Sequence, residues 1–174
     1  VQKFDANGNF LMKWGTYGTA NGQFMVPIGI AVDKDNGVYV VDSGNNRVQK
    51  FDANGQFVLA WGTKGTGNGQ FDRPTNVAVD RVGGVFVVDT GNKRVQKFDI
   101  LGRYLLGWGS AGTGNGQFNA PFAIATDPAG YSYVIDQDTD RIQKFDGIGQ
   151  FVTVWGSRGL GDGQFISAQG IAVD

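Results

Sequence analysis

The sequence contains no cysteine, no histidine and no glutamate. The lack of cysteine excludes disulfides and thiolate metal sites, and the lack of histidine removes the commonest general base and transition-metal ligand. All 16 acidic residues are aspartates, which favour turns, whereas the helix-favouring glutamate is missing. We therefore expect little helix and no histidine-dependent catalysis.

Long apolar runs and an excess of charge are missing as well. No apolar run approaches the roughly 18 residues that a membrane-spanning helix requires. The 15 basic and 16 acidic residues give a net charge of −1, and the basic residues are spread along the chain. We therefore expect neither nucleic-acid binding nor membrane insertion, because both require a concentrated basic or apolar surface.

What the sequence does contain is a repeat of 47 residues, the interval from Gly18 to Gly65. The glycine-rich stretch occurs four times as GTANGQF, GTGNGQF, GTGNGQF and GLGDGQF, and QKFD and tryptophan recur at the same interval. Such a stretch resembles phosphate-binding loops, but those loops open a helix and occur once. A copy in every repeat indicates a connector between structural units instead.

Each repeat contains four short apolar segments separated by hairpin-length turns. In one repeat they are Asn76–Asp80, Val85–Asp89, Arg94–Asp99 and Arg103–Gly109. This pattern predicts a four-stranded antiparallel meander. The second and third segments are apolar on both faces, so each small sheet requires cover on both sides, which favours a β-propeller.

Several side chains are predicted to hold the turns and connectors in place. Asp42 ends the second strand, and its carboxylate is expected to accept the N–H two residues further on. Arg47 follows and is expected to pair across the turn or to a neighbouring blade. The phenylalanines that end the glycine-rich connectors are expected to pack between blades: Phe24, Phe71, Phe118 and Phe165.

The pattern P-x-G-I-A-V-D, followed by V-Y-V-V-D-x-G-N-x-R-V-Q-K-F, resembles the NHL repeat. Here it is carried by Pro27, Gly29–Asp33, Val38–Asp42, Gly44, Asn45 and Arg47–Phe51. The resemblance covers essentially the whole chain. It implies an all-β propeller of four-stranded blades, commonly six, in which the first strand of each blade lines a central channel and the fourth is outermost.

The 174 residues make about 3.7 repeats of 47. We assign residues 1–27 to the third and fourth strands of a split blade plus a connector, 28–74, 75–121 and 122–168 to complete blades, and 169–174 to the first strand of the next blade. Because Val1 falls inside a repeat, we expect the chain to belong to a longer protein or to be processed. Another chain, or the rest of a longer one, is expected to complete the ring.

The resemblance implies three classes of function. The first is a non-enzymatic binding or scaffold module for proteins or small ligands, which nothing in the sequence contradicts. The alternatives are an RNA-binding propeller, which the net charge disfavours, and a lyase-like enzyme, which the absence of histidine disfavours. We expect no cofactor. The resemblance further suggests an extracytoplasmic or cell-surface location in a prokaryote.

A binding surface is best sought where the repeats differ, because packing does not fix the residue there. The most variable stretch is the entry to the first strand, at what would be the mouth of the channel. The candidate ligand-binding residues are Met25, Arg73, Thr75, Asn76, Asn119, Phe122 and Gln169. Their mixture of apolar, charged and amide groups is typical of recognition surfaces, whereas ordinary drift at tolerant surface positions is the slightly preferred explanation of the variation.

One turn departs from the common pattern by gathering aspartates. DQDTDR places Asp136, Asp138 and Asp140 at alternate positions, and Ca²⁺ takes six to eight oxygen ligands. The glycine and the distal glutamate of typical calcium loops are missing. A solvated acidic turn is therefore the preferred interpretation, and a weak Ca²⁺ site is the alternative.

Overall fold

The computed structural model describes all residues, 1–174, and its regular secondary structure consists of strands and three single-turn 3₁₀ helices joined by turns and loops. The strands are β1 (Gln2–Phe4), β2 (Phe10–Lys13), β3 (Thr16–Tyr17), β4 (Gln23–Phe24), β5 (Pro27–Val32), β6 (Val38–Asp42), β7 (Arg47–Phe51), β8 (Phe57–Trp61), β9 (Pro74–Val79), β10 (Val85–Asp89), β11 (Arg94–Phe98), β12 (Tyr104–Trp108), β13 (Pro121–Thr126), β14 (Ser132–Asp136), β15 (Arg141–Phe145) and β16 (Phe151–Trp155). The 3₁₀ helices are Ser43–Asn45, Thr90–Asn92 and Gln137–Thr139. No helix has the length and apolar character needed to span a membrane.

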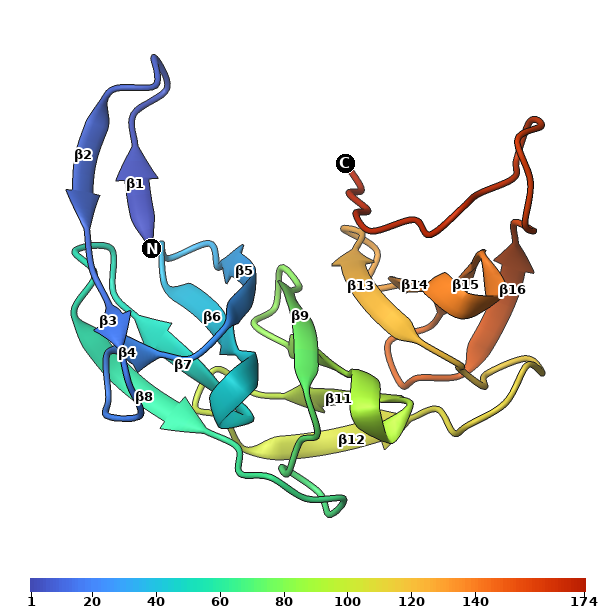
Figure 1. Cartoon of the computed structure of the whole chain (residues 1–174), viewed down its shortest axis with the longest axis horizontal. Coiled ribbons are helices and arrows are strands. Elements are labelled where there is room, and N and C mark those ends of the chain that lie inside the picture. Colours follow the sequence, from blue (N-terminus) through green and yellow to red (C-terminus); the bar gives the residue numbers. More distant parts are fainter.

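The strands form three complete antiparallel blades, as the repeat predicts. The first blade is β5–β8, the second β9–β12 and the third β13–β16. Figure 1 shows them side by side in an open arc, with β5, β9 and β13 on the inside and β8, β12 and β16 at the rim. β1 and β2 pair only with each other. The all-β class and the four-stranded blades are confirmed.

The blade boundaries differ slightly from the prediction. Pro27, Pro74 and Pro121 are already the first residues of β5, β9 and β13, one position before the predicted starts. Proline fits there because it lacks an N–H, which the first residue of a strand does not need. The predicted strand in residues 169–174 is not formed, since no strand lies beside it to supply hydrogen bonds, although Ile171 still packs on the third blade.

The hydrophobic core lies between the blades rather than within one. We call the contact between the first and second blades the first interface, and that between the second and third the second interface. The first buries Tyr39, Val41, Val48, Phe71, Val77, Val85, Val87 and Phe98. The second buries Ala78, Phe86, Val88, Val95, Phe118, Ile124, Val134 and Phe145. Phe24, Phe71 and Phe118 are buried as predicted, whereas Phe165 is only half-buried.

The tryptophan of each of the first two blades lies under a glycine of the next blade. A Cβ added to Gly102 would lie 2.8 Å from the Trp61 ring, and Gly149 meets Trp108 in the same way. Gly102 has φ +73°, a conformation in which a side chain is strained as well as too large for the space. In the third blade Trp155 remains 40% exposed.

The aspartate that ends each second strand joins the blade to the connector before it. Asp42 accepts the Met25 N–H at 2.7 Å and the Arg47 Nε–H at 2.7 Å, not the N–H two residues further on, so that prediction was wrong. Arg47 also donates to the carbonyls of Ala20 and Gln23 in the connector. The carboxylate makes no capping hydrogen bond to its own 3₁₀ turn and is used for the connector instead. The predicted aspartate–arginine pair is present.

Candidate functional site

The two ends of each blade carry different loops. The connectors and the 3₁₀ turns lie at the end where β5, β9 and β13 begin, and we call this end the mouth. The turns that join the first strand to the second and the third to the fourth lie at the opposite end. The candidate ligand-binding residues fall at the mouth, because they occupy the connector exits and the starts of β9 and β13.

A hollow of about 400 Å³ opens at the mouth of the first interface. We call it the mouth hollow, and its lining residues are Val26, Ile28, Ser43, Gly44, Arg73, Thr75, Thr90 and Phe122. Three of the predicted residues, Arg73, Thr75 and Phe122, thus lie together. The lining combines an apolar wall, three hydroxyl groups and one cation.

Two of the hydroxyls already have partners in the third blade. Thr75 Oγ1 lies 2.7 Å from the Phe122 carbonyl oxygen, Thr90 Oγ1 lies 2.7 Å from the Pro121 carbonyl oxygen, and the two hydroxyl oxygens are 2.8 Å apart. Two hydroxyl protons serve these three contacts, so one contact at any moment has no hydrogen bond. Thr75 therefore closes the second interface as well as lining the hollow.

The other four candidate residues lie outside the hollow. Met25 covers Gly44 on the far side of the turn, and Asn76 lies further along β9, with its backbone against Gly29. Asn119 is exposed, with its N–H bonded to the Asp136 carboxylate, and Gln169 is exposed in the segment that forms no strand. The variable stretch therefore does not act as one continuous surface.

Sequence comparison missed five lining residues. Val26, Ile28, Ser43, Gly44 and Thr90 come from the preceding connector exit and from the 3₁₀ turns. The available signal was the residue after each buried aspartate, which is Ser43, Thr90 or Gln137 in the three complete repeats. It was overlooked because these positions look like turn residues until the blades are placed side by side.

The aspartate-rich turn does not assemble a metal site. Asp136 is fully buried, and its carboxylate accepts the N–H of Ala120 at 2.6 Å and the Thr139 hydroxyl at 2.7 Å. Asp140 is buried too and accepts the Ser167 N–H at 2.8 Å, whereas Asp138 is exposed. No group of three ligand side chains forms, so the calcium alternative is not supported. The prediction that this turn is solvated is also wrong for two of its three aspartates, because the Asp136 and Asp140 carboxylates are buried and accept connector N–H groups.

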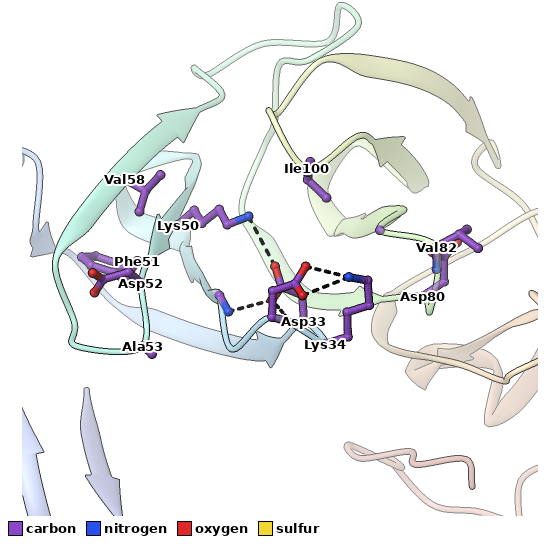
Figure 2. Close-up of a pocket in the computed structure, with 13 residues that line it drawn as sticks. Asp33, Lys34, Lys50, Phe51, Asp52, Ala53, Val58, Asp80, Val82 and Ile100 are labelled. Carbon is purple, nitrogen blue, oxygen red and sulfur yellow. Dashed lines mark hydrogen bonds and ion pairs between the residues drawn. The ribbon is translucent and has the colours of Figure 1, made fainter.

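A second hollow, of about 300 Å³, lies at the opposite end of the first interface. Figure 2 shows Lys50 directed toward Asp33, with Val58, Val82 and Ile100 around them. The Lys50 ammonium is 3.3 Å from the Asp33 carboxylate.

The carboxylate of Asp33 at that end is stabilised by several hydrogen bonds and an ion pair. Burial raises the pKa of Asp33, but hydrogen bonds from the Gly37 N–H and the Tyr39 hydroxyl, together with Lys50, outweigh it and hold the pKa below its usual value. Burial and the neighbouring Asp33 raise the pKa of Tyr39. These groups satisfy one another, so the mouth hollow is the better candidate site.

Comparisons with known proteins agree with this fold. Residues 24–51 and 71–98 match the NHL repeat. No curated protein matches the chain in sequence. Virginiamycin B lyase from Staphylococcus aureus is similar in structure, with a TM-score of 0.65 and 10% identity over 87% of this chain and 46% of that chain.

Two further structures resemble the chain. A gluconolactonase from Xanthomonas campestris has a TM-score of 0.61 and 17% identity over 87% of this chain and 53% of that chain. A nidogen/laminin complex has a TM-score of 0.55 and 23% identity over 76% of this chain and 48% of that chain. The chain thus spans about half the length of these proteins, and at such identities the similarity establishes the fold alone.

Proposed function

Because the chain is an NHL-repeat protein folded as consecutive propeller blades, we propose that it is a non-enzymatic binding or scaffold module that takes a ligand in the mouth hollow. A propeller fold by itself supports binding and catalysis alike, and the structurally similar proteins include a lyase and a lactonase. The choice therefore depends on the chemistry of the hollow.

The observation that carries the proposal is the composition of the hollow. Apolar side chains and hydroxyls line it, and Arg73 is the only ionisable group among them. General acid–base catalysis needs a group that exchanges a proton near neutral pH, which an arginine or a lone hydroxyl does not provide. A volume of about 400 Å³ falls within the range of small-molecule sites.

A fragment screen tests this proposal without knowledge of the natural ligand. A mixture of small neutral, anionic and cationic fragments is added to ¹⁵N-labelled protein, and amide shifts are mapped by NMR. We expect shifts at Val26, Gly44 and Arg73, and their loss in Arg73→Ala with Phe122→Ala while the melting temperature stays within a few degrees. Shifts confined to the opposite end, or accelerated hydrolysis of gluconolactone, would contradict the proposal.

We also propose that further NHL blades, from another chain or from the rest of a longer one, cover the side of the first blade that faces away from the second blade. Ile30 on this face is 54% exposed, whereas its counterparts Val77 and Ile124 are 3% and 4% exposed beneath neighbouring blades. Apolar positions that are buried in two repeats favour the same cover in the third.

Light scattering tests this proposal by measuring whether the isolated chain associates. The isolated chain is expected to associate beyond its 18.6 kDa mass, and Ile30→Asp is expected to reduce the association. Val58→Asp, at an exposed position on the outer strand β8, serves as the matched control. A monodisperse monomer with no tendency to associate would refute this part of the proposal.

A further inference from the structure

The mouth hollow contains a serine hydroxyl that has no hydrogen-bond partner in the chain. Ser43 is 7% exposed, and its hydroxyl makes no hydrogen bond in the chain. Both counterpart residues reach the chain 31 positions further on. Thr90 donates to the Pro121 carbonyl at the start of the third blade, and Gln137 donates to the Ala168 carbonyl in the C-terminal segment. The Ser43 oxygen itself is not fully buried, so it is open to the hollow and available to a ligand there.

Arg73 provides a positively charged group at the hollow. Its backbone is held by a hydrogen bond, whereas its side chain is largely exposed. Its N–H donates to Asn46 Oδ1 at 2.8 Å, and its φ of 48° lies in the left-handed region. The guanidinium is 73% exposed, and its only ion pair is a loose one of 3.7 Å with Asp72. A planar guanidinium presents paired N–H donors that match the two oxygens of a carboxylate.

The apolar part of the hollow comes from the first and the third blades. Val26 and Ile28 are exposed on the first-blade side, and half-buried Phe122 lies opposite them. Val26 has φ 52°, and the equivalent residues Arg73 and Ser167 have φ 48° and 52°, so this left-handed conformation belongs to the repeated connector exit. The connector exit therefore holds the exposed Val26 side chain at the rim of the hollow.

From these three features we infer that the ligand is a small molecule or peptide end that carries an apolar group next to a carboxylate. The carboxylate pairs with Arg73 and accepts the Ser43 hydroxyl, and the apolar group covers Val26, Ile28 and Phe122. This inference rests on the proposed binding function and names the ligand class of the same site.

The charges around the hollow are consistent with an anion. No carboxylate lines it. The nearby Asp42 and Asp89 are fully buried and paired with Arg47 and Arg94 at 2.7 and 2.8 Å. An anionic ligand therefore meets the exposed Arg73 guanidinium, whose competing carboxylate is the half-buried Asp72 at 3.7 Å.

The experiment compares two probes of nearly the same shape, the anionic N-acetyl-leucine and the neutral N-acetyl-leucinamide. Affinities are measured by NMR titration of the full chain. We expect the acid to bind about tenfold more tightly than the amide, with shifts at the mouth amides. Arg73→Gln should reduce the difference to less than about threefold, and Ser43→Ala should weaken the acid more than the amide.

Arg81→Gln is the matched control, because Arg81 is an exposed arginine in a turn at the opposite end. It should leave both affinities unchanged. If acid and amide bind the mouth equally, or if only other fragments bind there, the ligand class is wrong and the binding function stands. If neither probe nor any fragment shifts the mouth amides, both proposals fail.

Discussion

The first and second interfaces have the same apolar core but different polar contacts. Each buries eight hydrophobic residues, including one connector phenylalanine, Phe71 or Phe118. Four side-chain hydrogen bonds then cross the second interface. Their donors are Thr75, Thr90, Lys97 and Thr126, and each acceptor is a backbone carbonyl of the facing blade.

None of these hydrogen bonds crosses the first interface. Ile28 and Val79 stand where Thr75 and Thr126 stand, and neither carries a hydroxyl. The Ser43 hydroxyl makes no hydrogen bond, and Lys50 pairs with Asp33 of its own blade. The two hollows lie at the two ends of this interface. The comparison teaches that apolar repeats determine how blades stack, whereas a few polar positions decide whether an interface is closed or open to a ligand.

The largest expected effect tests whether the apolar cores are equivalent. Phe71→Ala and Phe118→Ala should each lower the free energy of unfolding by about 3–5 kcal/mol, since both side chains are fully buried. Urea denaturation of the two variants measures this. Losses that differ by more than about 2 kcal/mol would show that the cores are not equivalent.

A smaller effect is expected from removing the hydroxyl of Tyr39, whose counterpart in the second blade is Phe86. Tyr39→Phe removes a 3.0 Å hydrogen bond to the Asp33 carboxylate, at an expected cost of about 1.5–3 kcal/mol at pH 7. The lowered pKa of Asp33 stabilises the fold above the unfolded pKa near 3.8, and this stabilisation is lost as the pH falls through the folded value. The difference between variant and parent should therefore shrink by pH 2, as measured by urea denaturation at both pH values.

Removing a hydroxyl from each interface should give unequal results. Thr90→Val deletes the donor to the Pro121 carbonyl and should cost about 0.5–1.5 kcal/mol. Ser43→Ala deletes a hydroxyl that makes no hydrogen bond and should change the free energy of unfolding by less than about 0.5 kcal/mol. Equal losses in denaturant titrations would remove the distinction between a closed and an open interface.

The smallest effect is expected from adding a polar contact to the first interface. Thr126 donates to the Val79 carbonyl at 3.3 Å, and Val79→Thr places the same hydroxyl opposite the Val32 carbonyl. Because that hydrogen bond is long, we expect a gain of no more than about 0.5 kcal/mol, seen as a small rise in melting temperature. A fall in melting temperature would indicate that the first interface does not accept the hydroxyl.

The repeat made most of the fold predictable from the sequence. The four-stranded blades and the burial of Phe24, Phe71 and Phe118 follow from residues that recur in every repeat, because packing requires the same solution each time. The Arg47 partner of Asp42 was predicted, but its connector partner was not, since the Met25 N–H lies 17 positions away in the chain.

The candidate site was predictable only in part. Arg73, Thr75 and Phe122 were found because they vary between repeats, and the structure brings them together. Ser43 belongs to the same hollow, yet a serine after an aspartate reads as an ordinary turn residue. Its role follows from a missing hydrogen bond, which depends on the geometry between blades and leaves no trace in the sequence of a single blade.

The glycine-covered tryptophans give the chain an internal optical reporter. Trp61 and Trp108 lie beneath glycines of the next blade, so their indole fluorescence is expected at short wavelengths. Trp155 is 40% exposed, so its emission is expected at longer wavelengths. A partner blade that covers the third blade would shift this last component to the blue, so the emission spectrum of the unlabelled protein reports how many blade faces are covered.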